Sequence, residues 1–148
     1  MEKIDIVVCL DKRFVMPTGV MMYSVCANNP DTDIMFHLIA DESVTEADKK
    51  DLTVTATAFT RKDVRFYAIE AIRVKPYGES GRKSRRISLA AYYRLYIADI
   101  LPQNIHKVLY LDGDTIVRHS LLSLWEYNLN GVSLAAIKEA SSNEKNHY

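Results

Sequence analysis

Two aspartates that flank a single glycine are the residues of this sequence best suited to chemistry. Asp112, Gly113 and Asp114 directly follow the largely apolar run 107–111. The two carboxylates are hard oxygen donors that suit manganese or magnesium, ions that proteins commonly share with substrate phosphates. Gly113 lets the backbone turn and lets a diphosphate approach. Asp and Gly also dominate ordinary turns, so a plain turn at the end of a strand is the alternative interpretation.

The segments around this pair predict a sheet, with the aspartates at the end of one strand. Short runs rich in branched apolar residues predict strands that are buried on both faces, as in a parallel sheet. The predicted strands cover residues 4–10, 33–40, 64–69, 107–111 and 132–137. Since open α/β sheets bind ligands beyond the carboxyl ends of their strands, the aspartates would lie at such a site.

Helical patterns separate the predicted strands. Residues 14–28 have apolar side chains at helical spacing, with Pro17 in the first turn and a stop at Pro30. Residues 87–100 contain no Gly or Pro, and Ser88 is a candidate N-cap. Both segments are therefore predicted to be helices.

The stretch after residue 42 gives conflicting signals. Ser43 or Thr45 could cap a helix, with Glu46 or Asp48 completing a capping box. Apolar residues and threonines alternate over 52–58, however, which is typical of a strand. We predict a helix, because the cap signals agree with a strand–helix–strand unit at this point of the chain.

The alternation of strands and helices predicts a single α/β domain. It would cover residues 1–148 and contain a mainly parallel sheet with right-handed crossovers. Residues 121–125 add a helical turn, and residues 74–86 form a loop rich in Gly, Pro, Ser and basic side chains. The basic residues of this loop could steer an anionic ligand or could simply be solvated. They are Arg82, Lys83, Arg85 and Arg86.

The composition is that of an ordinary soluble globular domain. Of the 148 residues, 48% are hydrophobic and 26% are charged, and 19 basic side chains balance 19 acidic ones. Without net positive charge, the electrostatic footprint of a nucleic-acid-binding protein is missing. The two cysteines are Cys9 and Cys26, and Cys9 lies in an apolar run that favours a buried thiol in a reducing compartment. The apolar start is too short for a signal peptide or a membrane span, so we expect a cytoplasmic protein without a transmembrane segment.

An ordered set of motifs extends along nearly the whole chain. It begins with the first strand, continues through a turn and a strand with a histidine, and ends with the aspartate pair and a tryptophan. Its members are Asp5 to Asp11, 29–32, His37, Ile87-Ser88, Tyr93-Arg94-Leu95, 107–114, Val117 and Leu124-Trp125. In this order the motifs resemble glycosyltransferase family eight, which includes bacterial galactosyltransferases and glucosyltransferases of lipopolysaccharide synthesis and, more distantly, glycogenin.

The resemblance implies a GT-A fold, that is, a Rossmann-like and mainly parallel sheet flanked by helices, which these 148 residues would leave incomplete at the carboxyl end. It implies retaining transfer of a hexose from a UDP-sugar donor to a glycan or lipopolysaccharide-type acceptor. Manganese, or magnesium, would be held by Asp112 and Asp114. A lipid-linked acceptor would bring the protein to the inner face of the membrane as a peripheral protein.

The resemblance also assigns residues to the donor. The segment from Cys9 to Asp11 would lie against uracil and ribose, although from the residues alone Asp11 could equally be a solvated charge at the end of a strand. Arg94 would reach the donor sugar and diphosphate, whereas an arginine among apolar residues more often extends to water. The implied donor-binding residues are Cys9, Leu10, Asp11, Arg94, Asp112, Gly113 and Asp114, and Arg94, Asp112 and Asp114 would carry the catalysis.

Two features depart from the family pattern. Arg13 stands where the bacterial enzymes have a shorter polar residue that touches the nucleotide. The sequence also lacks residues that match the family's second half, which supplies an acidic donor-site residue, the acceptor surface and a histidine as third protein ligand of the metal. His106, His119 and His147 lie at positions that the family does not use. We therefore expect the 148 residues alone to bind UDP weakly with manganese and to transfer little sugar.

Two other functions are compatible with the aspartate pair. A truncated nucleotide-sugar-binding module would bind UDP with manganese without turning over a UDP-sugar. A phosphatase of the haloacid dehalogenase type also has two aspartates after an apolar strand. That class, however, has Thr or Val where this chain has Ile116, and its aspartates follow the first strand of the sheet. The phosphatase therefore fits less well than a glycosyltransferase.

Overall fold

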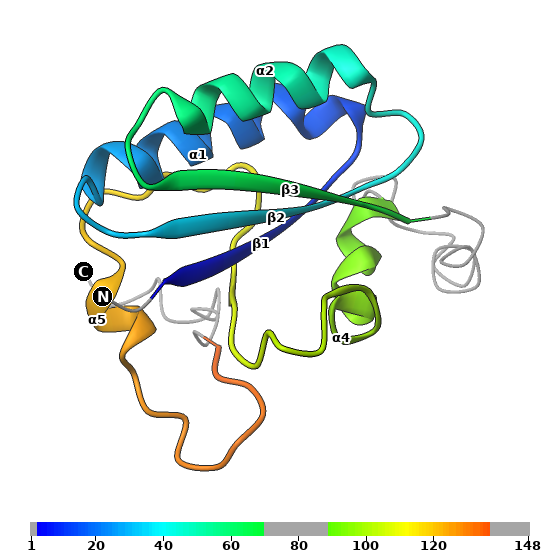
Figure 1. Ribbon diagram of the computed structural model, residues 1–148. Helices are drawn as coiled ribbons and strands as arrows, with labels where there is room; N and C mark the ends of the chain where they lie inside the picture. Colours follow the sequence, from blue (N-terminus) through cyan, green and yellow to red (C-terminus); the bar gives the residue numbers. More distant parts are fainter. Residues whose placement is uncertain (1–2, 70–88, 137–148) are drawn as a thin grey trace, which may run out of the picture.

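The protein contains a parallel sheet whose strands all run in the same direction (Figure 1). The computed structural model describes residues 3–69 and 89–136. Within these ranges the sheet has four strands in the order β3-β2-β1-β4. The strands are β1 (Ile4–Leu10), β2 (Ile34–Ala40), β3 (Lys62–Ala68) and β4 (Leu109–Tyr110). The predicted α/β class with a mainly parallel sheet is confirmed.

Helices cover both faces of the sheet. The long helices α1 and α2 lie on one face, and the shorter η3 and α4 lie on the other (Figure 1). None of the described helices is both long and apolar enough to cross a membrane. The helical segments are η1 (Lys12–Phe14), α1 (Val15–Asn28), α2 (Glu46–Thr57), η3 (Leu89–Tyr96), α4 (Ile97–Ile100) and α5 (Leu122–Trp125).

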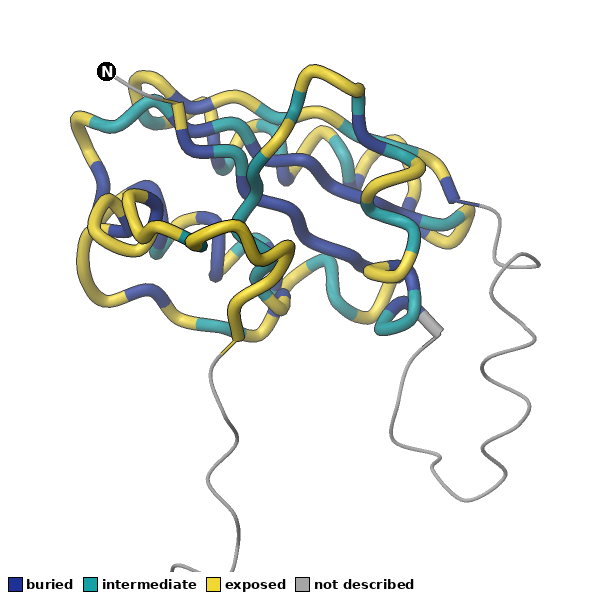
Figure 2. Tube along the Cα trace, turned by 90° about the horizontal axis from the view of Figure 1, so that it is seen from below, coloured by how far each residue is buried: buried dark blue, intermediate teal, exposed yellow. Residues whose placement is uncertain are grey.

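The strand β1 is buried on both faces and separates two apolar cores. Ile6 and Val8 pack in the core beneath α1 and α2, whereas Val7 and Cys9 pack in the core beneath η3 and α4. The central strands β1 and β2 are buried along nearly their whole length, and more exposed segments lie around them (Figure 2). This double burial explains why β1 is a nearly continuous apolar run and could be predicted with its observed bounds.

The cap chemistry after residue 42 decides the conflict between strand and helix in favour of helix. Thr45 caps α2, and Asp48 completes the capping box. The hydroxyl groups of Thr53, Thr55 and Thr57 donate to backbone carbonyls four residues earlier, over 2.7 to 2.9 Å. The alternation was misleading because threonine can satisfy its hydroxyl within a helix, and only part of the apolar set is buried.

The segment predicted as an α-helix over 87–100 is helical in its described part, but most of it is a 3-10 helix. From Leu89 to Tyr96 it is a 3-10 helix, and only Ile97–Ile100 is an α-helix. Ala90, Tyr93 and Tyr96 all pack in the second core. A spacing of three residues puts these three side chains on one side of a helix with three residues per turn, so the 3-10 winding suits their burial. The candidate cap Ser88, the loop 74–86 and its four basic residues lie outside the described residues.

Three strand predictions need correction. β3 begins at Lys62, two residues before the predicted start, because the buried ammonium of Lys62 bonds the carbonyls of Thr32 and Thr60 at the base of the strand. β4 is limited to two half-buried residues instead of 107–111, because only Leu109 and Tyr110 pair with β1. Residues 132–136 form no strand and are exposed, as no strand of the described ranges pairs with them.

A buried histidine joins three strands on the face that η3 and α4 cover in part. His37 of β2 is only 1% exposed. Its Nε2 lies 2.8 Å from Oδ1 of Asp5 in β1, and its Nδ1 lies 2.9 Å from the hydroxyl of Tyr67 in β3. The carboxylate can only accept, so Nε2 carries the proton and Nδ1 accepts from Tyr67. Burial lowers the pKa of His37, and the neighbouring Asp5 opposes this in part.

The lowered pKa of His37 predicts a loss of stability in mild acid. The unfolded chain takes up a proton at His37 near pH 6.5, about the ordinary value, whereas the folded chain does so only at lower pH. Unfolding should therefore become easier as the pH falls below about 6.5, and this residue should contribute no slope above that value. Thermal unfolding of the wild type and of His37→Gln between pH 5 and 8 measures the effect. Parallel pH profiles of the two proteins would contradict the assignment.

Candidate active site

The two aspartates leave the sheet at the carboxyl end of β4, beside the same end of β1. Parallel pairing aligns Val7 with Tyr110, and the N–H of Leu111 donates to the carbonyl of Val7 over 3.1 Å. The chain then turns, with the N–H of Thr115 donating to the carbonyl of Asp112 over 3.1 Å. Both aspartates are exposed. The topology thus puts the carboxylate pair at the ligand-binding end of a parallel sheet.

The segment that follows the aspartates is bonded along α1. Near the start of the helix, Gly113 packs against Thr18. Farther along, the N–H of Val117 donates to Oγ of Ser24 over 3.0 Å, and the side chain of Asn28 donates to the carbonyl of Val117 over 3.0 Å. At the helix end, Asn29 accepts the N–H of Leu121 over 2.7 Å. These side-chain contacts from one helix fix the path of the chain after the aspartates, and sequence patterns did not reveal them.

Gly113 is required because of a close contact with α1. A Cβ atom at this position would lie 2.5 Å from Oγ1 of Thr18, far inside the normal contact distance. The hydroxyl of Thr18 is buried and has no hydrogen-bond partner among the described residues. The sequence suggested Gly for a turn and for a diphosphate; the structure adds tight packing of the aspartate loop against the helix.

Arg94 and Tyr110 converge on Asp112. Nη2 of Arg94 lies 3.3 Å from Oδ1 of Asp112, and the hydroxyl of Tyr110 donates to the same oxygen over 2.9 Å. The guanidinium lies over the ring of Tyr110, 4.7 Å from its centroid, and Nε of Arg94 donates to the carbonyl of Ala91 over 2.7 Å. Arg94 therefore lies beside Asp112, one of the two candidate metal ligands. Tyr110 was not predicted, because an apolar strand pattern gives no sign of what its hydroxyl contacts.

Cys9 is buried near Arg94 and Asp112. It is 7% exposed, and burial raises its pKa to about 12, an effect that Arg94 opposes and Asp112 reinforces. The thiol is therefore neutral at ordinary pH and packs as an apolar group. Leu10 is fully buried in the first core, so its side chain lies away from any ligand and only its backbone could make a contact.

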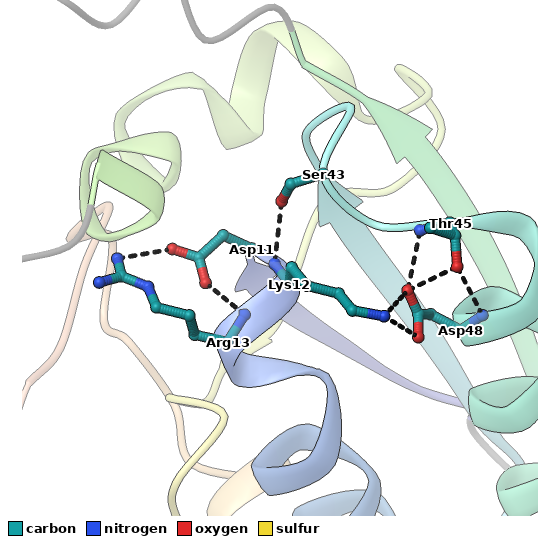
Figure 3. A network of polar contacts seen from close by, with 6 residues as sticks. All are labelled: Asp11, Lys12, Arg13, Ser43, Thr45 and Asp48. Carbon is teal, nitrogen blue, oxygen red and sulfur yellow. Dashed lines mark hydrogen bonds and ion pairs between the residues drawn. The ribbon is translucent and has the colours of Figure 1, made fainter.

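Asp11 is not a solvated charge, because it is only 9% exposed. Its Oδ1 accepts the backbone N–H of Arg13 over 2.9 Å, which caps η1, and its Oδ2 lies 3.0 Å from Nη2 of Arg13 (Figure 3). Arg13, which replaces the family's shorter polar residue, thus forms an ion pair with Asp11. Beside them, both oxygens of Asp48 accept from Nζ of Lys12, which lowers the pKa of Asp48 to about 2.

Asp112 and Asp114 fit a partial set of ligands for a divalent cation. They are hard oxygen donors on one short turn, and one oxygen of Asp112 is already oriented by Tyr110. Within the described residues no group of three His, Cys, Asp or Glu side chains gathers to hold a metal. A cation at this place would therefore take its other ligands from phosphate and water, as magnesium and manganese commonly do.

Comparison with known proteins identifies relatives of the chain. Residues 5–148 match the family described as Glycosyl transferase family 8. The chain is 29% identical over 136 residues to lipopolysaccharide 1,3-galactosyltransferase of Salmonella typhimurium, covering 92% of this chain and 39% of that protein. It is 24% identical over 144 residues to lipopolysaccharide 1,2-glucosyltransferase of Escherichia coli, covering 93% and 39%.

A solved structure agrees with the fold. The galactosyltransferase LgtC, in complex with donor and acceptor sugar analogs, superposes with a TM-score of 0.71 and 30% identity over 85% of this chain and 43% of that one. The predicted GT-A-like arrangement is thereby confirmed. The chain spans less than half the length of each of these relatives.

The packing of Gly113 against Thr18 predicts that a second substitution, at Thr18, can compensate for a side chain at position 113. Gly113→Ala should lower the free energy of unfolding by about 1–3 kcal/mol, the usual cost of overpacking. Adding Thr18→Ala removes Oγ1 and should restore part of the loss, whereas Thr18→Val keeps the bulk and should not. Urea unfolding of the single and double variants measures this. Equal recovery with both Thr18 replacements would contradict a steric cause.

Proposed function

Because the chain belongs to glycosyl transferase family 8, we propose that it forms the donor-binding part of a metal-dependent, retaining glycosyltransferase. The enzyme would move a hexose from a UDP-sugar to a glycan or lipopolysaccharide-type acceptor. The observation that carries the proposal is the convergence of Arg94 and Tyr110 on Asp112 at the carboxyl ends of β1 and β4. A guanidinium beside carboxylates that could hold a cation, at the carboxyl end of a parallel strand, suits a sugar diphosphate.

Asp112 and Asp114 are the proposed protein ligands of manganese or magnesium. When bound, such an ion acts as a Lewis acid and neutralises negative charge on the departing UDP. The contribution of the chain is to hold the two carboxylates. Tyr110 orients Asp112 through Oδ1, and the bonds from α1 to residues 117 and 121 fix the loop that carries Asp114. Little reorganisation would then be needed when the donor binds.

Arg94 is the proposed electrostatic partner of the diphosphate. Its Nη2 contacts Asp112, so a phosphate oxygen bound beside Asp112 comes within reach of the same guanidinium fork. Arginine suits this role because its planar, permanently charged group can give two parallel hydrogen bonds to phosphate. The ring of Tyr110 beneath the guanidinium restricts its position.

The segment from Cys9 to Asp11 is the proposed contact for uracil and ribose. It lies at the carboxyl end of β1, next to β4, and Cys9 is close enough to Arg94 and Asp112 for both charges to affect its pKa. Burial is the main cause that raises the pKa of Tyr93, which precedes Arg94, and the charge of Asp11 adds a smaller contribution. These proximities support one continuous site for nucleotide, diphosphate and sugar.

We place this activity in the cytoplasm, with peripheral association at the inner face of the membrane when the acceptor is linked to lipid. Cys9 and Cys26 are both free and buried, as expected where thiols stay reduced. The lipopolysaccharide transferases among the relatives support an acceptor of that type.

Binding of UDP in the presence of manganese tests the proposed ligands. Asp112→Asn and Asp114→Asn should each weaken manganese-dependent UDP binding by about tenfold or more, because each removes a charged metal ligand. Calorimetry at fixed manganese measures the affinity, and Asp51→Asn on the exposed side of α2 serves as the matched control. Wild-type affinity in Asp114→Asn would show that the pair does not share a cation.

Release of UDP from UDP-glucose and UDP-galactose distinguishes the transferase from a nucleotide-sugar-binding module. The module, the second candidate, would bind the nucleotide sugar at the same residues without turning it over. Manganese-dependent UDP binding without release of UDP from either sugar nucleotide would favour the module.

Arg94→Ala should weaken binding of UDP-glucose more than binding of UMP, because only the former presents a diphosphate and a hexose. The difference should be about tenfold, as for loss of a charged hydrogen bond. Arg94→Lys keeps the charge without the planar fork and should be intermediate. Equal losses for both ligands would indicate a packing defect instead of a ligand contact.

A further inference from the structure

Tyr93 lies inside the protein, and its hydroxyl group is hydrogen-bonded to a carboxylate that is far away in the sequence. Tyr93 is 0% exposed and packs with Val7, Cys9 and Ile39 in the second core. Its hydroxyl donates to Oδ2 of Asp41 over 2.6 Å. Burial raises the pKa of Tyr93, and the bond to Asp41 adds to this effect. The phenol therefore keeps its proton and stays the donor in this pair.

Asp41 connects Tyr93 to the ends of two strands. It directly follows β2, and its Oδ1 accepts the backbone N–H of Ser43 over 2.9 Å and the hydroxyl of Ser43 over 2.5 Å. Oγ of Ser43 in turn accepts the backbone N–H of Lys12, just beyond β1, over 2.9 Å (Figure 3). The two oxygens of Asp41 therefore make separate contacts, since Oδ1 fixes the turn after β2 and Oδ2 holds Tyr93.

Arg94 follows Tyr93 and points in a different direction. In a 3-10 helix, successive side chains are separated by about 120°, so a residue next to a buried one projects away from the core. Tyr93 enters the core, and the partly exposed Arg94 reaches Asp112. Since the arginine side chain is long and has many rotamers, it can be held beside Asp112 only if the backbone beneath it is fixed.

We propose that Asp41 and Tyr93 are a positioning pair that sets Arg94 beside Asp112, and so couples the ends of β1 and β2 to the diphosphate side of the donor site. Neither residue touches the donor in this scheme. Asp41 and Tyr93 act through Arg94. The proposal rests on the proposed function for its effect on the donor, but the placement of Arg94 can be measured without any ligand.

A purely structural role for the hydrogen bond makes different predictions. A bond that only stabilises the fold would lower the melting temperature when removed, without a selective effect on Arg94. A positioning bond changes the behaviour of Arg94 itself, and its effect on the donor disappears once Arg94 is gone.

The first experiment uses the ligand-free chain. Nε of Arg94 donates to the carbonyl of Ala91, so its N–H should give a protected signal in nitrogen-15 NMR, assigned by its loss in Arg94→Lys. Tyr93→Phe keeps the buried ring and removes only the hydroxyl; Asp41→Asn changes the acceptor. Both should shift or broaden this signal. The matched control Tyr92→Phe removes a hydroxyl from the same segment and should leave the signal unchanged.

The second experiment is a double-mutant cycle with UDP and manganese as the probe. Tyr93→Phe should weaken binding about threefold to tenfold in the wild-type background, and should have no further effect in Arg94→Ala. The melting temperature of each variant is measured at the same time, to show that the chain is folded at the temperature of the titration.

The outcomes separate the proposals. An unchanged Arg94 signal in Tyr93→Phe, or an equal loss of binding with and without Arg94, overturns the positioning role. If the wild type does not bind UDP with manganese, the proposed function is wrong, and the NMR signal alone supports or overturns the placement of Arg94 by the pair.

Discussion

The burial of β1 on both faces is the constraint on which the rest of the structure depends. A strand with apolar side chains on each side must lie between two layers, so one core forms beneath α1 and α2 and another beneath η3 and α4. Its neighbours are then fixed as β2 and β4, both parallel to it. Parallel pairing brings the polar residues after these strands to one edge. Asp11, Asp41 and Asp112 meet there because each directly follows, or nearly follows, a strand.

The aspartate loop depends on α1 more than on the sheet. β4 supplies only two paired residues, which is too little to fix the chain beyond it. The helix supplies the missing restraint through Ser24, Asn28 and Asn29, whose side chains bond the backbone of Val117 and Leu121. Near the start of α1, the buried hydroxyl of Thr18 lies against Gly113 and leaves no space for a side chain at that position. The polar side chains of α1 therefore hold the segment 113–121 against the helix.

Strong local patterns were sufficient to predict most of the fold. The first strand and the first helix follow directly from apolar periodicity, and the cap formed by Thr45 and Asp48 decided α2 against a misleading alternation. Local patterns failed where tertiary packing sets the geometry. The tight winding of η3 depends on how its buried residues meet β1, and the length of β4 depends on how few of its residues pair with β1. Of the site, residues 11, 94 and 112–114 were predicted as candidates, whereas Tyr110 was not, because its role depends on which atom its hydroxyl meets.

The site combines weak contacts at its surface with strong ones beneath. Arg94 and Asp112 are 43% and 56% exposed, and an ion pair in that setting contributes about 0–1 kcal/mol after screening and entropy. A donor diphosphate with its cation could therefore replace the partner of either group at small cost. The hydrogen bonds that place these residues are different, because Leu121 and Asn29 are both buried, and Tyr93 is fully buried although its partner Asp41 is only half-buried. Breaking such a bond leaves a buried polar group unpaired, which costs about 1–3 kcal/mol. Under the proposed function, this difference in cost would let the surface pair exchange partners while the backbone beneath it stays in place, which is the preorganisation that electrostatic catalysis requires.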